Sequence, residues 1–219
     1  MEYDLSRIDI ISDVICPWCY IGKRQLERAL PELAAEGLRF SIHWNPFQLN
    51  PDMPAEGRDR MSYRMAKFGS AERCAEIDAN ITAVAATLGL EFHLERQTRT
   101  PNTVAAHRVV WLAGQQNVQD AVVEALFKGF FCDGRDLGNA ETLAEIAEGA
   151  GLSGVMAMLA SDDGLDAVLR GDAMARNAGI SGVPSFALAG HVLFSGAQPA
   201  SQMVVSFRHA HDVLSRRAA

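Results

Sequence analysis

The stretch that decides the fold is Asp13-Val14-Ile15-Cys16-Pro17-Trp18-Cys19-Tyr20-Ile21-Gly22, which holds two cysteines three positions apart. It follows residues 8–12, a short β-branched run of the kind found in strands. From Cys19 to Leu33 apolar residues then recur at helical spacing. Pro17 suits the first turn of a helix, where its missing N–H costs nothing. The sequence therefore predicts a strand that passes directly into a helix, with both thiols in the first turn.

This placement has chemical consequences for the two thiols. Cys16 would lie at the helix N-terminus, where unpaired N–H groups and the positive end of the helix dipole favour a thiolate. Residues three apart on a helix are neighbours, so the Cys19 sulfur can reach the Cys16 sulfur. We assign Cys16 as the attacking thiolate and Cys19 as the resolving thiol, with Pro17 and Trp18 completing the motif between them.

A Cys-x-x-Cys pair can also be half of a zinc site, which needs four ligands. The chain has no second pair of this kind. His209 and His211 are candidate suppliers, but as residues of the last predicted helix they have a simpler interpretation as ordinary helix positions. We therefore predict no metal.

Composition limits the other classes of function. The formal charge of −7 and the absence of a Lys/Arg run argue against a nucleic-acid partner. No apolar run approaches the ~20 residues of a membrane span, and the N-terminus does not resemble a leader, so we expect a cytoplasmic protein with no membrane partner. Of the remaining cysteines, Cys74 is expected to be buried in a helix stripe, and Cys132 likewise unless it is a secondary redox thiol.

The rest of the chain frames this motif as an α/β protein. Residues 38–44 alternate as a strand does, which gives a strand-helix-strand unit with parallel pairing. The proline-rich residues 45–54 are predicted to be a loop that borders the thiols. Residues 179–188 and 191–195 form a predicted hairpin, followed by a helix that starts near Pro199.

Between these two parts the pattern is helical. Ser70 and Asn139 are predicted helix caps within it. We assign residues 1–56 and 178–219 to one domain, and residues 57–177 to a helical domain inserted into it.

Four motifs make the chain resemble a known family. They are Asp13-x-x-Cys16-Pro17-Trp18-Cys19-Tyr20-Ile21-Gly22, Asn102-Thr103-x-x-Ala106-His107-Arg108, Gly182-Val183-Pro184-x-Phe186 and Ser195-Gly196-Ala197-Gln198-Pro199. Together they resemble the DsbA family, in particular its cytosolic FrnE-like branch, over almost the whole chain. The resemblance implies a thioredoxin fold (βαβ, then ββα) with a large inserted all-helical domain, and protein-disulfide oxidoreductase or isomerase activity.

The resemblance also implies roles for residues far from the thiols. Pro184 matches the cis-proline that faces the redox pair, and the Val183 backbone is expected to pair with a substrate strand. Asn102, Thr103 and His107 match a helix that borders the active-site groove in this family. His107 is then either a proton acceptor or substrate contact, or a satisfied core residue.

The expected partners follow from the same resemblance. The substrate would be a disulfide-containing protein or peptide, and no cofactor is implied beyond a reductant, which is a small thiol such as glutathione or a thioredoxin-type protein. The first DsbA proteins known carry histidine where this chain has Trp18, so we expect a less oxidising couple that favours reduction or reshuffling. Exposed faces on a large helical insert are compatible with a homodimer.

Two other functions remain open. The 2-hydroxychromene-2-carboxylate isomerases and kappa-class glutathione transferases resemble this chain in overall order. They typically have serine at the first thiol position and an acidic then a basic residue after the glycine that corresponds to Gly196, where this chain has Ala197-Gln198-Pro199. The third interpretation is a non-enzymatic accessory binding protein in polyketide biosynthesis.

Overall fold

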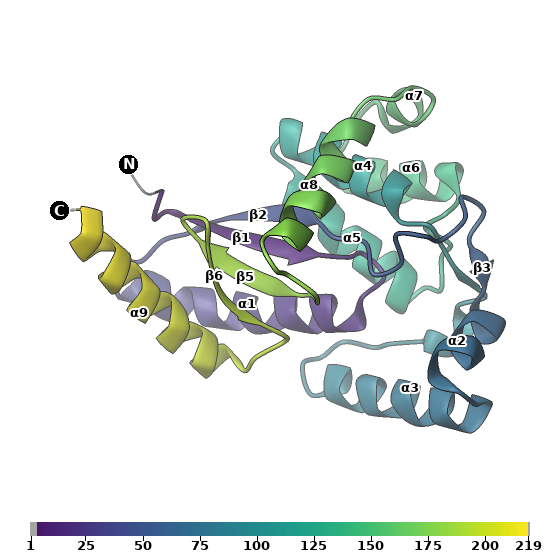
Figure 1. The fold of residues 1–219 in the computed structure, drawn as a ribbon, viewed down its shortest axis with the longest axis horizontal. Helices are drawn as coiled ribbons and strands as arrows, with labels where there is room; N and C mark the ends of the chain where they lie inside the picture. The colour runs from purple at the N-terminus through teal and green to yellow at the C-terminus, as the bar shows by residue number, and fades with distance from the viewer. Residues whose placement is uncertain (1–3, 219) are drawn as a thin grey trace.

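The computed structural model describes residues 4–218, and a four-stranded sheet lies at its centre (Figure 1). Its strands are β1 (Arg7–Ser12), β2 (Ser41–Pro46), β5 (Ser185–Leu188) and β6 (His191–Ser195), in the order β2-β1-β5-β6. β2 pairs with β1 in parallel, whereas β5 and β6 pair antiparallel. This topology confirms the predicted thioredoxin-like fold.

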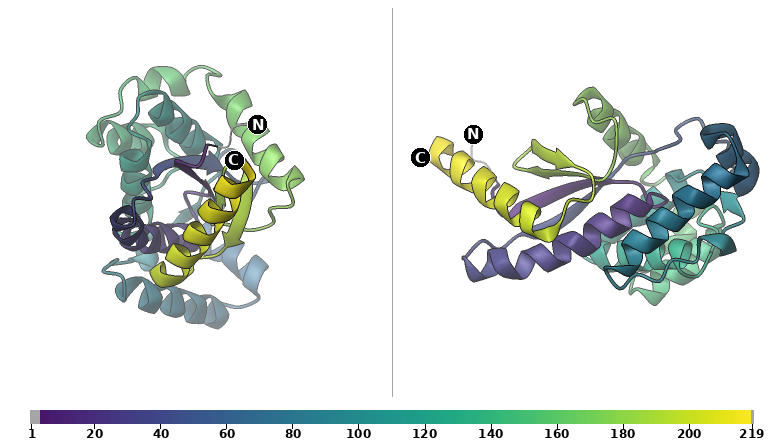
Figure 2. Two further views of the ribbon diagram at one scale, coloured as in Figure 1. Left: turned by 90° about the vertical axis from the view of Figure 1, so that its left-hand side faces the viewer. Right: turned by 90° about the horizontal axis from the view of Figure 1, so that it is seen from below.

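The two faces of the sheet are covered by different helices. Helices α1 (Pro17–Ala35) and α9 (Ala200–Ala218) pack side by side on one face, and α8 (Leu165–Asn177) crosses the other (Figures 1 and 2). Ile8 and Ile10 belong to the main core, while Ile11 joins a second, smaller cluster with Ala175 of α8. This alternation is the period of two that a strand buried on both faces requires.

The segment between β2 and β5 is mainly helical, as predicted. Its helices are α2 (Arg60–Phe68), α3 (Ala71–Ala86), the 3-10 helix η1 (Leu94–Arg96), α4 (Val104–Gln115), α5 (Gln119–Phe131), α6 (Ala140–Gly149), α7 (Val155–Leu159) and α8. Ser70 and Asn139 cap α3 and α6, because their side chains accept the N–H groups of Arg73 and Thr142. Two short strands that the sequence did not predict, β3 (Arg58–Asp59) and β4 (Arg99–Thr100), pair with each other.

The predicted bounds of β2 were wrong at both ends. Gly37 ends α1 with a positive φ of 86°, and the Leu38 N–H bonds to the Leu33 carbonyl, so the chain is still closing the helix where we expected a strand. At the other end β2 continues through Pro46, which we had placed in a loop. Proline is tolerated there because β2 is an edge strand.

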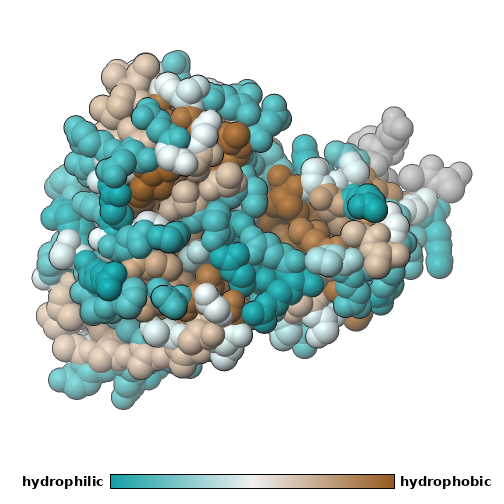
Figure 3. Space-filling model, turned by 180° about the vertical axis from the view of Figure 1, so that it is seen from behind, coloured by the Kyte–Doolittle hydropathy of each residue, from teal (hydrophilic) through white to brown (hydrophobic). Residues whose placement is uncertain are grey.

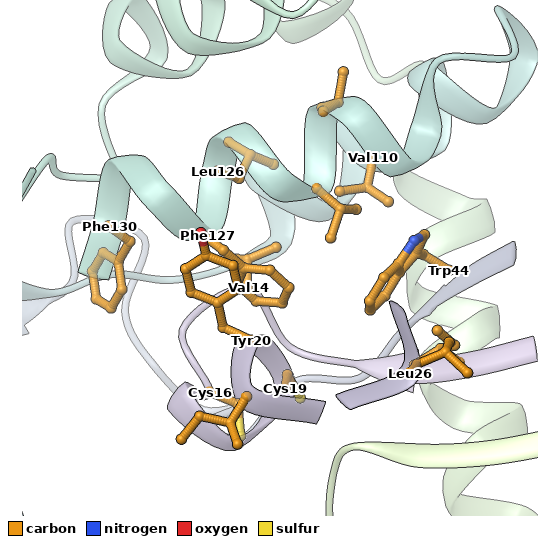
Figure 4. Close-up of a cluster of buried hydrophobic side chains, with 14 of the residues drawn as sticks. Val14, Cys16, Cys19, Tyr20, Leu26, Trp44, Val110, Leu126, Phe127 and Phe130 are labelled. Atoms are coloured by element: carbon orange, nitrogen blue, oxygen red, sulfur yellow. The ribbon is translucent and has the colours of Figure 1, made fainter. Parts of the chain in front are cut away.

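One hydrophobic core joins the sheet to the helical segment. The Tyr20 ring of α1 stacks on Phe127 of α5 at 5.0 Å between ring centroids, and Trp44 of β2 meets Phe127 edge-on (Figure 4). Because the core is continuous, the domain boundaries at residues 57 and 177 stay a prediction.

Hydrophobic and hydrophilic side chains share the surface, and the exposed large hydrophobic residues include Met61, Met174 and Val205. Figure 3 shows hydrophobic patches (brown) divided by hydrophilic side chains (teal) on one face. Across residues 4–218, every helix is too short or too polar to span a lipid bilayer.

The outer edge of β2 is closed by a side chain rather than by a strand. The Trp44 N–H donates to Oε1 of Gln119 at 2.8 Å, and Nε2 of Gln119 donates to the Trp44 carbonyl at 3.1 Å. A buried side-chain amide thus satisfies both backbone groups, which would otherwise lose their partners on burial.

We expect Gln119→Glu to destabilise the protein by about 1–3 kcal/mol, because a carboxylate can accept from Trp44 but cannot donate to its carbonyl. Chemical denaturation measures the change, and Gln115→Glu, at an exposed position on α4, is the matched control. Equal stability of the two variants would contradict this role for Gln119.

Candidate active site

The two cysteines lie at the junction of β1 and α1, as predicted (Figure 4). Cys16 is the N-cap residue with an extended ψ of 113°, and Pro17 follows in the first turn. Two backbone hydrogen bonds of 3.0 Å, from Cys16 N–H to Asp13 and from Cys19 N–H to Cys16, fix the turn. Both cysteines are free thiols, and Cys16 is close enough to Cys19 to influence the Cys19 pKa.

Burial separates the roles available to the two thiols. Cys19 is completely buried, and this burial raises its pKa well above the usual value, with the adjacent Cys16 acting in the same direction. Ser12 and the backbone N–H of Asp13 act in the opposite direction but do not outweigh burial. Cys19 therefore stays protonated at neutral pH, which suits a thiol that acts second.

A loop distant in sequence closes over the thiols. The Val183–Pro184 peptide bond is cis, and the Cys16 thiol donates to the Val183 carbonyl with 3.5 Å between Sγ and O. Pro184 also packs against α1 at Gly22, where a Cβ atom would lie 2.9 Å from the proline Cγ. The structure thus brings Cys16, Cys19 and Pro184 together.

A buried carboxylate ties this junction to its surroundings. Asp13 is completely buried, and its Oδ2 accepts the Leu49 N–H at 2.8 Å. Its Oδ1 lies 3.3 Å from Nε2 of His107, but that nitrogen is also 3.2 Å from the Phe47 carbonyl. The Nε2 of His107 can carry only one hydrogen, and when that hydrogen points at the Phe47 carbonyl it is not aligned with Asp13. This agrees with the absence of a hydrogen bond to Oδ1 of Asp13.

Of the three predicted groove residues, only His107 lies close to Asp13 beside the thiols. His107 is buried, and its backbone N–H bonds to the Thr103 carbonyl. Asn102 donates to the Met53 carbonyl at 2.7 Å and accepts the Val104 N–H at 2.9 Å. None of Asn102, Thr103 and His107 lines the cavity that contains Cys16, so their contact with a substrate stays a prediction.

A cavity of about 370 Å³ opens beside Cys16. Cys16, Trp18 and Val183 line one side, and Leu49 and Asn50 place the loop after β2 on its border, where we predicted it. Cys16 is only 4% exposed and borders this cavity, whereas Trp18 on its border is 36% exposed.

The sequence analysis missed the opposite wall, which α2 provides. Arg60, Arg64 and Lys67 of α2 all line the cavity. Their spacing of four and three residues places them on one helix face, a signal present in the sequence. What the sequence does not contain is that this face and the Cys-x-x-Cys turn line the same cavity.

The other two cysteines differ from the pair. Cys74 is buried, as predicted. Cys132 is half-buried, and burial together with the neighbouring Asp133 raises its pKa, which disfavours its thiolate. Within residues 4–218 no three His, Cys, Asp or Glu side chains gather closely enough to hold a metal ion.

A Cys-x-x-Cys pair at a helix N-terminus, facing a cis X-Pro bond in this fold, defines a thiol-disulfide site of the thioredoxin type. The family model described as a DsbA-like thioredoxin domain matches residues 7–207. The chain therefore belongs to the DsbA-like thioredoxin domain family, a family of oxidoreductases and isomerases.

Individual relatives agree with this assignment. A probable DsbA oxidoreductase from Streptomyces coelicolor superimposes with a TM-score of 0.82 at 32% identity, over 93% of this chain and 89% of that one. An uncharacterised protein of Bacillus subtilis, YwbO, is 26% identical over 147 residues, which is 67% of each chain. A 2-hydroxychromene-2-carboxylate isomerase shares the fold, with a TM-score of 0.68 at 15% identity. The match covers 96% of this chain and 97% of that one.

We expect Gly22→Ala to destabilise the protein by about 1–3 kcal/mol and to slow thiol exchange, because the added methyl group would displace Pro184 from its place beside Cys16. Gly149→Ala is the control, since no atom lies within 4 Å of the methyl group that it adds to α6. Thermal unfolding measures the stability of both variants, and a thiol-exchange assay measures their rates. Equal stability and equal rates in the two variants would contradict this role for Gly22.

We expect the Cys19 thiol to titrate at a higher pH in the folded protein than in the unfolded chain, whose cysteines titrate near about 8.5. The measurement uses Cys16→Ser/Cys74→Ser/Cys132→Ser, in which burial still raises the pKa of Cys19. Thiolate absorbance is followed with pH, with the same protein in urea as the control. A lower midpoint in the folded protein would contradict the expectation.

Proposed function

We propose that this protein is a thiol-disulfide oxidoreductase or isomerase of the FrnE-like branch, acting on disulfides in proteins or peptides. The observation that carries the proposal is the meeting of Cys16, Cys19 and the Val183–Pro184 loop at the border of an open cavity. Membership of the DsbA-like family supports the same chemistry.

The reaction begins when the Cys16 thiolate attacks one sulfur of the substrate disulfide. A mixed disulfide forms, and the other substrate sulfur leaves as a thiolate that takes up a proton. Cys19 then loses its proton and attacks Cys16, which releases the second substrate thiol. The protein dithiol has supplied two electrons and become a disulfide, and an external thiol or a thioredoxin-type reductant restores it.

The Val183 backbone is suited to hold the substrate during this exchange. Its carbonyl already accepts from the Cys16 thiol at 3.5 Å, so an extended peptide that pairs with this residue would bring its disulfide to the attacking sulfur. The Pro184 ring, fixed against Gly22, keeps that backbone in place.

The direction of the reaction depends on the redox potential and on the compartment. Trp18 brings no positive charge to the thiolate, unlike the histidine of the first known DsbA proteins. In a cytoplasmic environment the pair would be largely a dithiol, which favours reduction or reshuffling of substrate disulfides.

Two other proposals remain distinct from this one. A glutathione-dependent isomerase or transferase shares the fold, but this chain has Cys16 in place of serine and Ala197-Gln198 in place of the acidic and basic pair. Isomerisation with glutathione that survives Cys16→Ser would favour it. A non-enzymatic binding protein would show no thiol-dependent activity at all.

We expect the protein to reduce insulin and to reactivate scrambled ribonuclease, and Cys16→Ala to lower both activities to the uncatalysed rate because it removes the attacking sulfur. Cys132→Ala, which removes a thiol outside the pair, is the matched control and should keep both activities. Loss of neither activity in Cys16→Ala would refute the proposed mechanism.

A further inference from the structure

The cavity beside Cys16 has a charge opposite to that of the whole chain. Arg60, Arg64, Lys67 and Arg99 line it, and Asp78 is the only carboxylate among its lining residues in the described part of the chain. The protein as a whole carries a formal charge of −7. The net positive charge of this cavity, in a chain that is negative overall, therefore needs a local explanation.

The positive charge in this wall is only partly neutralised by its neighbours, and Arg99 lies 3.9 Å from the carboxylate of Asp136. Arg60 and Arg64 share the single carboxylate of Asp78, at 2.8 and 2.7 Å. Lys67 is held by neutral groups instead, with its Nζ 2.9 Å from the Tyr63 hydroxyl. Within residues 4–218 no carboxylate oxygen lies within 4.0 Å of the Lys67 ammonium group, which leaves it available to an anion.

The other walls of the cavity are apolar. Ile81, Leu94 and Phe130 are buried residues that line it, and Trp18 and Phe68 are exposed aromatic residues on its border. A volume of about 370 Å³ is in the range of small-ligand pockets, which extends from about 300 to 1,000 Å³. The cavity suits a small molecule with an apolar body and an anionic end.

We propose that this cavity selects low-molecular-weight disulfides and thiols that carry carboxylate groups, as the small co-substrates of the Cys16–Cys19 pair. The inference rests on the proposed function, because it concerns the same thiols. Three of the four cations come from α2 and the fourth, Arg99, comes from β4. The glutathione-dependent relatives instead carry their charged pair in the segment after the glycine that corresponds to Gly196. The proposed function leaves the small thiol partner open, and the cations of the cavity favour one that carries a carboxylate group.

The exchange balances without any further reactant. The Cys16 thiolate attacks a disulfide RSSR, forms the mixed disulfide and releases one RS⁻, which is protonated. Cys19 gives up its proton, attacks Cys16 and releases the second RSH. Two electrons pass from the protein dithiol to the small disulfide, and the reverse sequence with two RSH restores the dithiol.

The test compares three symmetrical disulfides that differ in charge. They are 3,3′-dithiodipropionate, an anion, bis(2-hydroxyethyl) disulfide, which is neutral, and cystamine, a cation. Reduced full-length protein is mixed with each, and formation of the Cys16–Cys19 disulfide is followed by acid quenching and mass spectrometry. Each rate is divided by that of the same disulfide with dithiothreitol, which corrects for intrinsic reactivity.

We expect the normalised rates to fall from anion to neutral molecule to cation, with at least about a tenfold difference between the extremes at low salt. The difference should shrink as ionic strength rises from about 0.01 to about 1 M, because the Debye length falls from about 30 to about 3 Å. Lys67→Gln should reduce the anion-to-cation ratio at least about threefold, and Lys67→Glu further.

Arg28→Gln is the control, because it makes the same change of charge at an exposed position on α1 outside the cavity. It should leave the ratio unchanged. If all three disulfides react without this order, or if Lys67→Gln leaves the ratio as it was, the inference is overturned and the proposed function stands. If no disulfide oxidises the pair, the proposed function itself fails.

Discussion

Close contact between α1 and the loop before β5 is the constraint on which the site depends. The helix can approach that loop only because residue 22 has no side chain, since a Cβ there would lie 2.9 Å from Pro184 and 3.4 Å from Phe186. The approach places the Val183 carbonyl 3.5 Å from the Cys16 sulfur. Cys16 and Val183, 167 positions apart in sequence, thus become one site through packing alone.

The helical segment contributes to the same site by fixing the other side of α1. Lys23 is only 3% exposed, yet Glu27, Asp120 and Glu124 surround its ammonium group, with Asp120 and Glu124 at 3.2 and 3.0 Å. Burial opposes the charge, but the three carboxylates outweigh it and raise the pKa of Lys23. Because Asp120 and Glu124 belong to α5, a buried charge cluster as well as the aromatic stack joins the redox helix to the inserted segment.

Local signals in the sequence were enough for much of this structure. The Cys16-Pro17 turn, the cap residues Ser70 and Asn139, and the hairpin at Ala189-Gly190 each depend on neighbours within a few positions, and all were predicted. The predicted start of β2 was wrong because the end of α1 occupies those residues, and its predicted end was wrong because Pro46 is tolerated in an edge strand. The two-residue strands β3 and β4 are too short to show a period. Lys67 and Cys16 line the same cavity only through tertiary structure, which no residue pattern in a single sequence encodes.

The hydrogen bonds between the Gln119 amide of α5 and the outer edge of β2 have a consequence for the behaviour of the protein at high concentration. Exposed strand edges are where sheets of separate molecules join and aggregation begins. Since this side chain occupies the backbone groups of Trp44, the β2 edge cannot template such growth there. The liability is left with β6 at the opposite edge, where Val192 is 46% exposed and an irregularity in the pairing with β5 interrupts the regular ladder that an incoming strand would need.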